Sequence, residues 1–134
     1  MSDQRPLPVF EPGQVETDVF WSHAQRKELV YQRCAAGHLV FYPRGHCTTC
    51  GTAELEVLTS RGVGTIYSFT VTRAHPSEYF AARVPYVVGL VDLDEGFRML
   101  SEISGDIDGI RIGARVRLAW DTSGDLPVPV FILD

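Results

Sequence analysis

Three cysteines and one histidine between residues 34 and 50 are residue types that hold metal ions, at a spacing suited to that role. Cys47 and Cys50 form a C-x-x-C pair, and His38 follows Cys34 by four residues. Zinc prefers four tetrahedral ligands drawn from thiolate and imidazole donors. We therefore predict a structural zinc site with the ligands Cys34, His38, Cys47 and Cys50.

Other interpretations of these residues stay open. His46 is a poorer fourth ligand, because side chains of adjacent residues diverge on an extended chain and Cys47 is its neighbour. The alternatives are a ribbon that has lost its metal, a labile site, a catalytic zinc with an open water position, and a redox-active pair. The redox interpretation is the weaker one, because the pair precedes Gly51 instead of opening a helix that would lower a thiol pKa.

Length and composition indicate an ordinary globular protein. The chain has 134 residues, of which 45% are hydrophobic and 22% are charged, a balance typical of folded soluble domains. No stretch approaches the roughly 18 apolar residues of a membrane span, and the first residues lack the features of a signal peptide. We expect a cytoplasmic protein without membrane association, where reduced cysteines favour metal binding over disulfides.

The charge of the chain argues against a nucleic-acid partner. The formal net charge is −5, whereas non-specific nucleic-acid binding depends on neutralising many phosphates. A single-stranded nucleic-acid-binding module is the alternative function, because OB-folds and zinc ribbons elsewhere bind single strands. Lys27 is the one lysine among 12 basic residues, so the remaining cations are guanidinium groups suited to phosphate or carboxylate.

The N-terminal part predicts an arm followed by a short helix. Prolines and a glycine crowd residues 1–13, which favours an extended arm that packs on something else. Thr17 is a plausible N-cap, and Phe20 and Ala24 lie at helical spacing after it. We predict one amphipathic helix that begins at Thr17.

The middle of the chain predicts a zinc ribbon. Short apolar stretches at 29–33, 39–43 and 54–60 flank the cysteines, as strands do around zinc knuckles. About 25 residues cannot bury enough apolar surface to fold alone, so the metal would supply the missing free energy. Without metal this segment should be the weakest part of the chain.

The C-terminal part predicts a small closed barrel. Five stretches separated by turn signals are typical of strands, at 62–74, 85–94, 97–104, 114–121 and 128–134, with a hairpin at 94–96 and a connection at 106–113. An OB-fold is a five-stranded Greek-key barrel. We expect a mainly β protein with three parts: an N-terminal arm and helix over 1–33, a zinc ribbon over 34–60 and an OB-fold barrel over 61–134.

The order of these motifs resembles a known family. The motifs are Y-x-R-C-x-x-G, F-Y-P-R-x-x-C-x-x-C-G, G-x-G-x-I-Y-S-F-T-V, P-Y-V-V-G-L-V-D-L-D-E-G and R-I-G-x-R-V. Together they are similar to the bacterial and archaeal zinc-ribbon/OB-fold family, a domain of unknown function associated with acyl-CoA metabolism. The resemblance runs from about residue 17 to residue 132. Its second zinc cysteine matches Gly37 here, which leaves His38 as the substitute.

The resemblance implies a rubredoxin-like zinc ribbon and a non-catalytic partner subunit. Members of the family associate with thiolase-superfamily enzymes, including thiolases and the aldolases that shorten steroid side chains, and sometimes with hydratase-type subunits. It implies a hetero-oligomer that runs a thiolase or carbon–carbon lyase reaction, with zinc in the ribbon and a coenzyme A thioester in the complex. A third interpretation is a coenzyme A thioester carrier or sensor that acts alone.

Two further sets of residues are candidates for binding. Arginines at the knuckle, the ribbon–barrel junction and the first barrel loop would form a cationic rim for coenzyme A phosphates if they converge; scattered solvated arginines are the alternative. These arginines are Arg44, Arg61, Arg73 and Arg83. Aromatic side chains could line an adenine or acyl pocket, although barrel core and partner contact are their more frequent uses. The candidate partner contacts are Phe20, Trp21, Tyr67, Phe80 and Tyr86.

The sequence offers no catalytic constellation. Asp92, Asp94 and Glu95 precede a glycine, as polar residues of a solvated turn do. His75 precedes a proline in a loop. The chain has no nucleophile elbow, no P-loop and no dinucleotide-binding glycine fingerprint, so we assign no catalytic residue.

Overall fold

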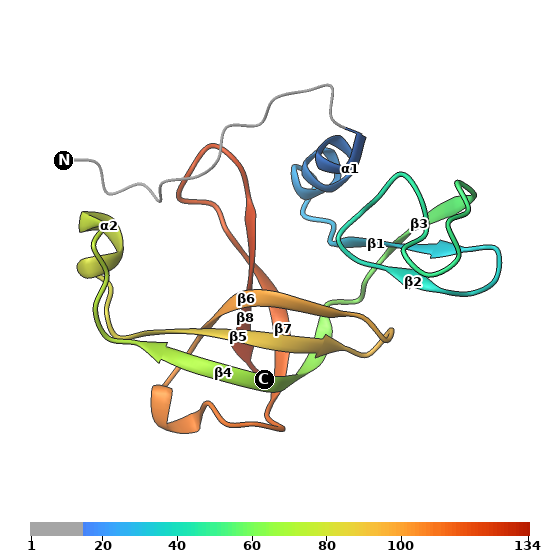
Figure 1. Cartoon of the computed structure of the whole chain (residues 1–134). Helices are drawn as coiled ribbons and strands as arrows, with labels where there is room; N and C mark the ends of the chain where they lie inside the picture. Colours follow the sequence, from blue (N-terminus) through green and yellow to red (C-terminus); the bar gives the residue numbers. More distant parts are fainter. Residues whose placement is uncertain (1–14) are drawn as a thin grey trace.

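A computed structural model describes residues 15–134, which form a helix, a small sheet and a barrel (Figure 1). The predicted arm over 1–13 lies outside the described residues. Helix α1 (Val15–Ala24) begins two residues before the predicted Thr17, a difference within the range over which helix ends are defined. Ala24 is buried, and Phe20 packs against the core of the barrel. Within residues 15–134 no helix is long and apolar enough to cross a membrane.

The predicted zinc ribbon is present as a three-stranded antiparallel sheet. Its strands are β1 (Val30–Cys34), β2 (Leu39–Val40) and β3 (Leu55–Thr59), in the order β2-β1-β3. The sheet begins at Val30, before the predicted boundary at residue 34. The two turns that carry the cysteines extend from the ends of these strands.

The five predicted C-terminal strands form a closed barrel with OB-fold topology. The strands are β4 (Val63–Thr72), β5 (Tyr86–Leu93), β6 (Arg98–Ser104), β7 (Arg115–Asp121) and β8 (Val128–Leu133), in the order β4-β5-β6-β8-β7. Pairing of β4 with β7 closes the barrel, and β6 with β8 is the parallel pair. The connections hold a short helix α2 (Glu78–Ala81), which was not predicted, and a 3-10 turn η1 (Ile107–Gly109).

The ribbon and the barrel share one hydrophobic core. The ring of Tyr31, from β1, stacks on Phe97 of the β5–β6 turn with 4.9 Å between centroids, and Phe41 lies 4.8 Å from the same ring. Leu29 and Tyr31 belong to the same buried cluster as the barrel residues Val91 and Phe97. The ribbon is therefore packed onto the barrel, and is not an annex joined by a linker.

Glu95 fixes the point where the ribbon passes into the barrel. One carboxylate oxygen accepts a 2.7 Å hydrogen bond from the Ser60 hydroxyl, and the other accepts a 3.0 Å bond from the Arg61 backbone N–H. The Ser60 hydroxyl in turn accepts a 3.0 Å bond from the N–H of Gly62. The Glu95 side chain is only 12% exposed, so these hydrogen bonds are largely shielded from water.

Replacing Glu95 by alanine is expected to destabilise the protein by about 2 kcal/mol, because hydrogen bonds to a charged group contribute about 1.5–3 kcal/mol. Urea denaturation of Glu95→Ala would measure the change. Glu54→Ala is the matched control, since Glu54 is exposed on the ribbon and its loss should cost under about 0.5 kcal/mol. Equal midpoints for the two variants would contradict a structural role for Glu95.

Candidate metal site and docking groove

The predicted metal ligands converge at one end of the ribbon. One donor atom from each of Cys34, His38, Cys47 and Cys50 lies within 4.8 Å of the others. His38 Nδ1 is 3.3 Å from Cys34 Sγ and 3.9 Å from Cys47 Sγ, and the sulfurs of Cys34 and Cys50 are 3.9 Å apart. His46 is exposed and is not a member of the cluster.

These separations fit a zinc ion. With Zn–S near 2.3 Å and Zn–N near 2.0 Å, the edges of a tetrahedral site are about 3.5–3.8 Å long. Three of the donor pairs, at 3.3, 3.9 and 3.9 Å, lie close to that range, and all donors lie within 4.8 Å of one another. A donor set of three thiolates and one imidazole is also the chemistry of structural zinc sites, so the residues present suit the metal.

Two turns aim the four donors inward. The first places the N–H of Gly37 2.9 Å from the Cys34 carbonyl, and the second places the N–H of Gly51 2.9 Å from the Cys47 carbonyl. Both glycines have positive φ, +90° and +79°, a conformation that glycine adopts without steric cost. Because the chain turns at Gly37, the next residue, His38, supplies the donor.

Hydrogen bonds at the second turn favour the thiolate of Cys47. Backbone N–H groups of Cys50 and then Thr49 point at its sulfur and lower the Cys47 pKa from 9.0 to about 6; the Thr49 N–H lies 3.4 Å from it. The thiolate is the form of cysteine that binds zinc. The turn therefore prepares Cys47 for metal binding.

We expect cobalt substitution to report a site with three thiolates and one imidazole. In His38→Cys, the thiolate-to-cobalt charge-transfer band should grow by about one third, since four thiolates replace three. In His38→Ala, metal affinity should fall by more than the roughly 10–100-fold that loss of an outer-shell partner costs. An unchanged spectrum and affinity in His38→Ala would exclude His38 as the fourth ligand.

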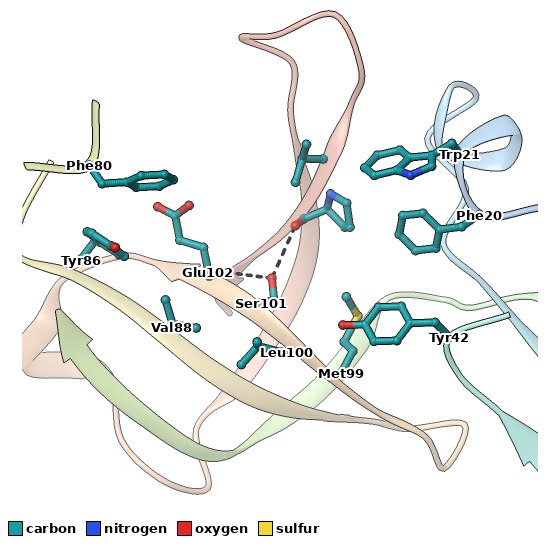
Figure 2. Close-up of a pocket in the computed structure, with 12 residues that line it drawn as sticks. Phe20, Trp21, Tyr42, Phe80, Tyr86, Val88, Met99, Leu100, Ser101 and Glu102 are labelled. Carbon is teal, nitrogen blue, oxygen red and sulfur yellow. Dashed lines mark hydrogen bonds between the residues drawn. The ribbon is translucent and has the colours of Figure 1, made fainter. Parts of the chain in front are cut away.

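A second feature is an apolar groove between α1, α2 and the outer face of the barrel (Figure 2). Its volume is about 420 Å³. Strand β6 forms the floor, where the side chain of Leu100 is 56% exposed. The walls are mainly aromatic, and the lining residues are Phe20, Trp21, Tyr42, Phe80, Tyr86, Val88, Met99, Leu100, Ser101, Glu102, Val128 and Pro129.

The groove brings together most of the aromatic residues predicted to contact a partner. Phe20, Trp21, Phe80 and Tyr86 line it. Tyr67 does not; it is half exposed elsewhere on the barrel, with the guanidinium of Arg98 3.5 Å above its ring. The sequence analysis did not select Tyr42 or Leu100 as contact residues. For Leu100 the available signal was an apolar residue at a solvent-facing position of β6.

The structure does not bring the four candidate arginines to one place, and their role in binding coenzyme A stays a prediction. Arg61 and Arg73 flank opposite ends of the ten-residue strand β4, which spans about 30 Å at 3.3 Å per residue. Arg73 and Arg83 do flank the same connection, because Thr72 pairs with Tyr86. The guanidinium of Arg83 lies 4.3 Å from the centre of the Tyr79 ring, and Arg44 lies in the ribbon.

The acidic residues of the β5–β6 turn are engaged in ion pairs. Arg98 pairs with Asp92, and Arg115 donates 2.8 and 2.7 Å hydrogen bonds to Asp94. The Arg115 guanidinium lowers the pKa of the Asp94 carboxyl. These contacts match the prediction of a polar turn.

His75 also makes local contacts. Its Nδ1 accepts a 3.0 Å hydrogen bond from the N–H of Ser77, and its ring centroid lies 4.9 Å from that of Phe80. Both contacts hold the segment that leads into α2. The imidazole thus has a structural part at the edge of the groove.

Two family models match consecutive parts of the chain. Residues 21–56 match the ChsH2 rubredoxin-like zinc ribbon domain, and residues 58–121 match the ChsH2 C-terminal OB-fold domain. Together the two matches follow the ribbon and the barrel seen in the structure. The first match ends at residue 56 and the second begins at residue 58, so the boundary between them lies within β3.

Comparison with individual proteins gives similar results. A probable enoyl-CoA hydratase alpha subunit of Thermomonospora curvata is 36% identical, over 97% of this chain and 42% of the relative. A DUF35 domain-containing scaffold protein of Methanothermobacter thermautotrophicus is 38% identical, over 78% of this chain and 81% of the relative. A solved structure described as the Ltp2-ChsH2(DUF35) aldolase is 33% identical with a TM-score of 0.80, over 95% of this chain and 98% of that chain. The chain thus spans about two fifths of the hydratase subunit and nearly all of the aldolase chain.

Proposed function

The chain belongs to the DUF35 family, with the zinc ribbon and OB-fold of ChsH2, and from this premise we propose that it is a non-catalytic accessory subunit. It binds a thiolase-superfamily enzyme, either a thiolase or a thiolase-like aldolase, and helps to form the acyl-CoA site of the hetero-oligomer. The steroid or other acyl-CoA side chain is cleaved by the partner. The similarity to the Ltp2-ChsH2(DUF35) aldolase, 33% over 98% of that chain, carries the proposal. The names of the relatives, an alpha subunit and a scaffold protein, support a subunit role.

The apolar groove is the docking surface in this proposal. Binding energy at protein interfaces is concentrated in buried aromatic anchors and the pockets that receive them. The groove offers both, with Trp21 and Phe20 on one wall, Phe80 and Tyr86 on the other, and Leu100 exposed on the floor (Figure 2). The groove is a contiguous apolar hollow on an acidic chain. Covering such a surface with a partner lowers the free energy of the system.

The α2 end of the barrel is the part that we assign to coenzyme A. Arg73 and Arg83 flank the connection that carries α2, next to the groove residues Phe80 and Tyr86. Guanidinium groups bind phosphate through two parallel hydrogen bonds. In the complex, these two arginines would hold phosphates of the coenzyme while the acyl group reaches the partner.

The metal has a structural role in this proposal. Zinc bound by Cys34, His38, Cys47 and Cys50 would cross-link the two turns of the ribbon, whose donors already lie within 4.8 Å of one another. All four positions around the ion are then filled by protein, which is typical of structural sites and leaves no open position for a substrate. The ribbon residues Tyr31 and Phe41 pack on the barrel, so the metal indirectly stabilises one side of the groove.

A pull-down of the tagged chain from its host tests the proposal. We expect a thiolase-like protein in comparable amount, identified by mass spectrometry. Leu100→Glu should lower its recovery by about 30-fold, since truncating an interface anchor costs about 2 kcal/mol or more. Ile112→Glu is the matched control, because Ile112 is 68% exposed and does not line the groove.

The two arms of this experiment separate the claims. If wild-type protein recovers no thiolase-like partner, the proposed function is wrong. If it recovers the partner and Leu100→Glu does so equally well, the function stands and the docking surface lies elsewhere.

A further inference from the structure

The groove lies along an edge of strand β6. Four consecutive residues of that strand, Met99–Glu102, line it, and their side chains alternate between the inside and the outside of the barrel. On this side β6 faces β8, and within residues 15–134 the two strands pair only at Ile103 and Ser104. The groove also contacts Val128 and Pro129 at the start of β8. It therefore occupies the place where the barrel opens between β6 and β8.

The backbone of Leu100 points into this opening. Hydrogen-bonded and non-bonded residue pairs alternate along antiparallel strands. The Leu93 N–H donates a 2.8 Å hydrogen bond to the Phe97 carbonyl, so the β6 residues that bond to β5 are the second and fourth after Phe97, namely Met99 and Ser101. The N–H and the C=O of Leu100 therefore lie on the opposite edge of β6, toward the groove.

The facing edge of β8 is a poor partner for another strand. The Asp134 N–H donates a 3.1 Å hydrogen bond to the Arg115 carbonyl, so by the same alternation Val130 bonds to β7 and Pro129 faces the opening. Proline has no N–H to donate, and the Pro129 carbonyl accepts a 3.5 Å hydrogen bond from the Ser101 hydroxyl (Figure 2). Of the two edges at the opening, the edge of β6 is the one suited to pairing.

An extended segment suits this edge better than a helix does. A helix satisfies its own backbone groups, so it would bury the N–H and C=O of Leu100 without partners, which costs free energy. A strand added to a sheet edge bonds to such groups through its main chain and places its side chains in pockets. Aromatic rings stand at both ends of the opening, with Tyr42 beside Met99 and with Phe80 and Tyr86 at the other end (Figure 2). The groove therefore fits an extended segment with apolar side chains.

The charges favour a different protein over a second copy of this chain. The formal net charge is −5, and exposed carboxylates lie on two segments that border the groove, Glu78 on α2 and Asp125 in the β7–β8 connection. A second copy would bring the same excess of negative charge, and like charges across an interface are unfavourable. A segment of another protein that carries a basic residue complements these carboxylates.

We propose that the thiolase-like partner inserts an extended apolar segment into the groove, where the segment pairs with the free edge of β6 through the N–H and C=O of Leu100. This inference rests on the proposed function and names the element of the partner that the groove receives. The side chain of Leu100 contributes an apolar contact, and its backbone determines the register of the segment. The barrel thereby gains a short added strand between β6 and β8.

Hydrogen exchange of single amides, followed by NMR, tests the open edge in the free chain without any partner. The Leu100 N–H should exchange at least about 100-fold faster than those of Met99 and Ser101, because amides within a ladder are protected. A Leu100 N–H as slow as its neighbours would overturn the proposal, since the edge would already be bonded. Protection that increases with protein concentration would also overturn it, because a second copy would then occupy the edge.

Removing the Leu100 N–H tests the pairing with the partner that the pull-down recovers. Replacing Leu100 by its α-hydroxy acid keeps the side chain and exchanges the N–H for an ester oxygen. Affinity for the partner should fall about fivefold, as expected for the loss of one hydrogen bond.

The matched control is the same replacement at Val57. This residue lies on β3, an outer strand of the ribbon sheet, and does not line the groove. The Ser60 N–H donates to the Leu29 carbonyl, so by the alternation of bonded pairs the Val57 N–H points away from β1. Neither replacement removes a ladder hydrogen bond, so both chains should keep the wild-type melting temperature, and the Val57 ester should keep the wild-type affinity.

The outcomes separate this proposal from the proposed function. If the partner is recovered and the Leu100 ester binds it as tightly as wild type does, the strand pairing is wrong and the function stands. If the pull-down recovers no thiolase-like protein, both are wrong.

Discussion

Removal of zinc, or replacement of Cys47 by serine, is expected to unfold residues 35–54, which include both metal turns, while β1, which packs on the barrel through Tyr31, and the barrel strands stay folded. The cause is the small size of the ribbon's own buried cluster. It consists of Cys34, Val40 and Cys47 with Leu55 packed against it, so two of its members are metal ligands. Zinc supplies about 10–16 kcal/mol in zinc-finger peptides at neutral pH, far more than such a cluster provides.

Hydrogen exchange with mass spectrometry measures this effect. Amide protection of residues 35–54 should be lost after chelation and in Cys47→Ser, whereas the ladders between β4, β5 and β6 should keep theirs, because the barrel closes on itself. Thr48→Ala is the matched control, since Thr48 is an exposed neighbour in the same turn. A ribbon that stays protected after metal analysis shows no zinc would mean that packing alone holds it.

Replacing Phe97 by alanine is expected to destabilise the ribbon and the barrel together, by about 3–5 kcal/mol. Phe97 is 6% exposed and contacts both Tyr31 and Phe41 of the ribbon. Its removal leaves a cavity between the two parts and takes away aromatic stacking as well as buried area. The melting temperature should fall by more than about 10 °C.

Thermal unfolding followed by probes of each part measures the Phe97 effect. With Trp21 replaced by phenylalanine in every variant, Trp120 fluorescence reports on β7, and cobalt absorption in the substituted protein reports on the ribbon. Both transitions should shift to the same lower temperature in Phe97→Ala. Ile112→Ala is the control, because that side chain is 68% exposed. A ribbon transition that stays in place while the barrel transition falls would contradict a shared core.

Local sequence patterns predicted most of the fold. Alternation over β7, and turn signals before β8, predicted strands close to those observed, and the β5–β6 hairpin followed from its turn residues. The start of α1 was two residues off, because several residues suit a first turn. Helix α2, only four residues long, has no periodicity that a sequence pattern can reveal.

The metal site was predictable because its donors are close in sequence and their spacing determines the local turns. Contacts between residues far apart in the sequence were not predictable. Tyr31 and Phe97 meet across 66 positions, and nothing in either local pattern links them. The groove depends on several separate segments in the same way, so Leu100 looked like any outward residue. The relative positions of the candidate arginines were not predictable either, since they depend on the length of β4, which separates Arg61 from Arg73.

The central claim is that this chain is a subunit of a thiolase-like enzyme complex. The most direct test is to mix the purified chain with the thiolase-like protein that the pull-down is expected to recover, and to measure the mass by size-exclusion chromatography with light scattering. We expect one species whose mass is the sum of whole numbers of both subunits, and loss of that species in Leu100→Glu but not in Ile112→Glu. Two separate peaks at the masses of the individual proteins, from wild-type chain shown to contain zinc, would contradict it.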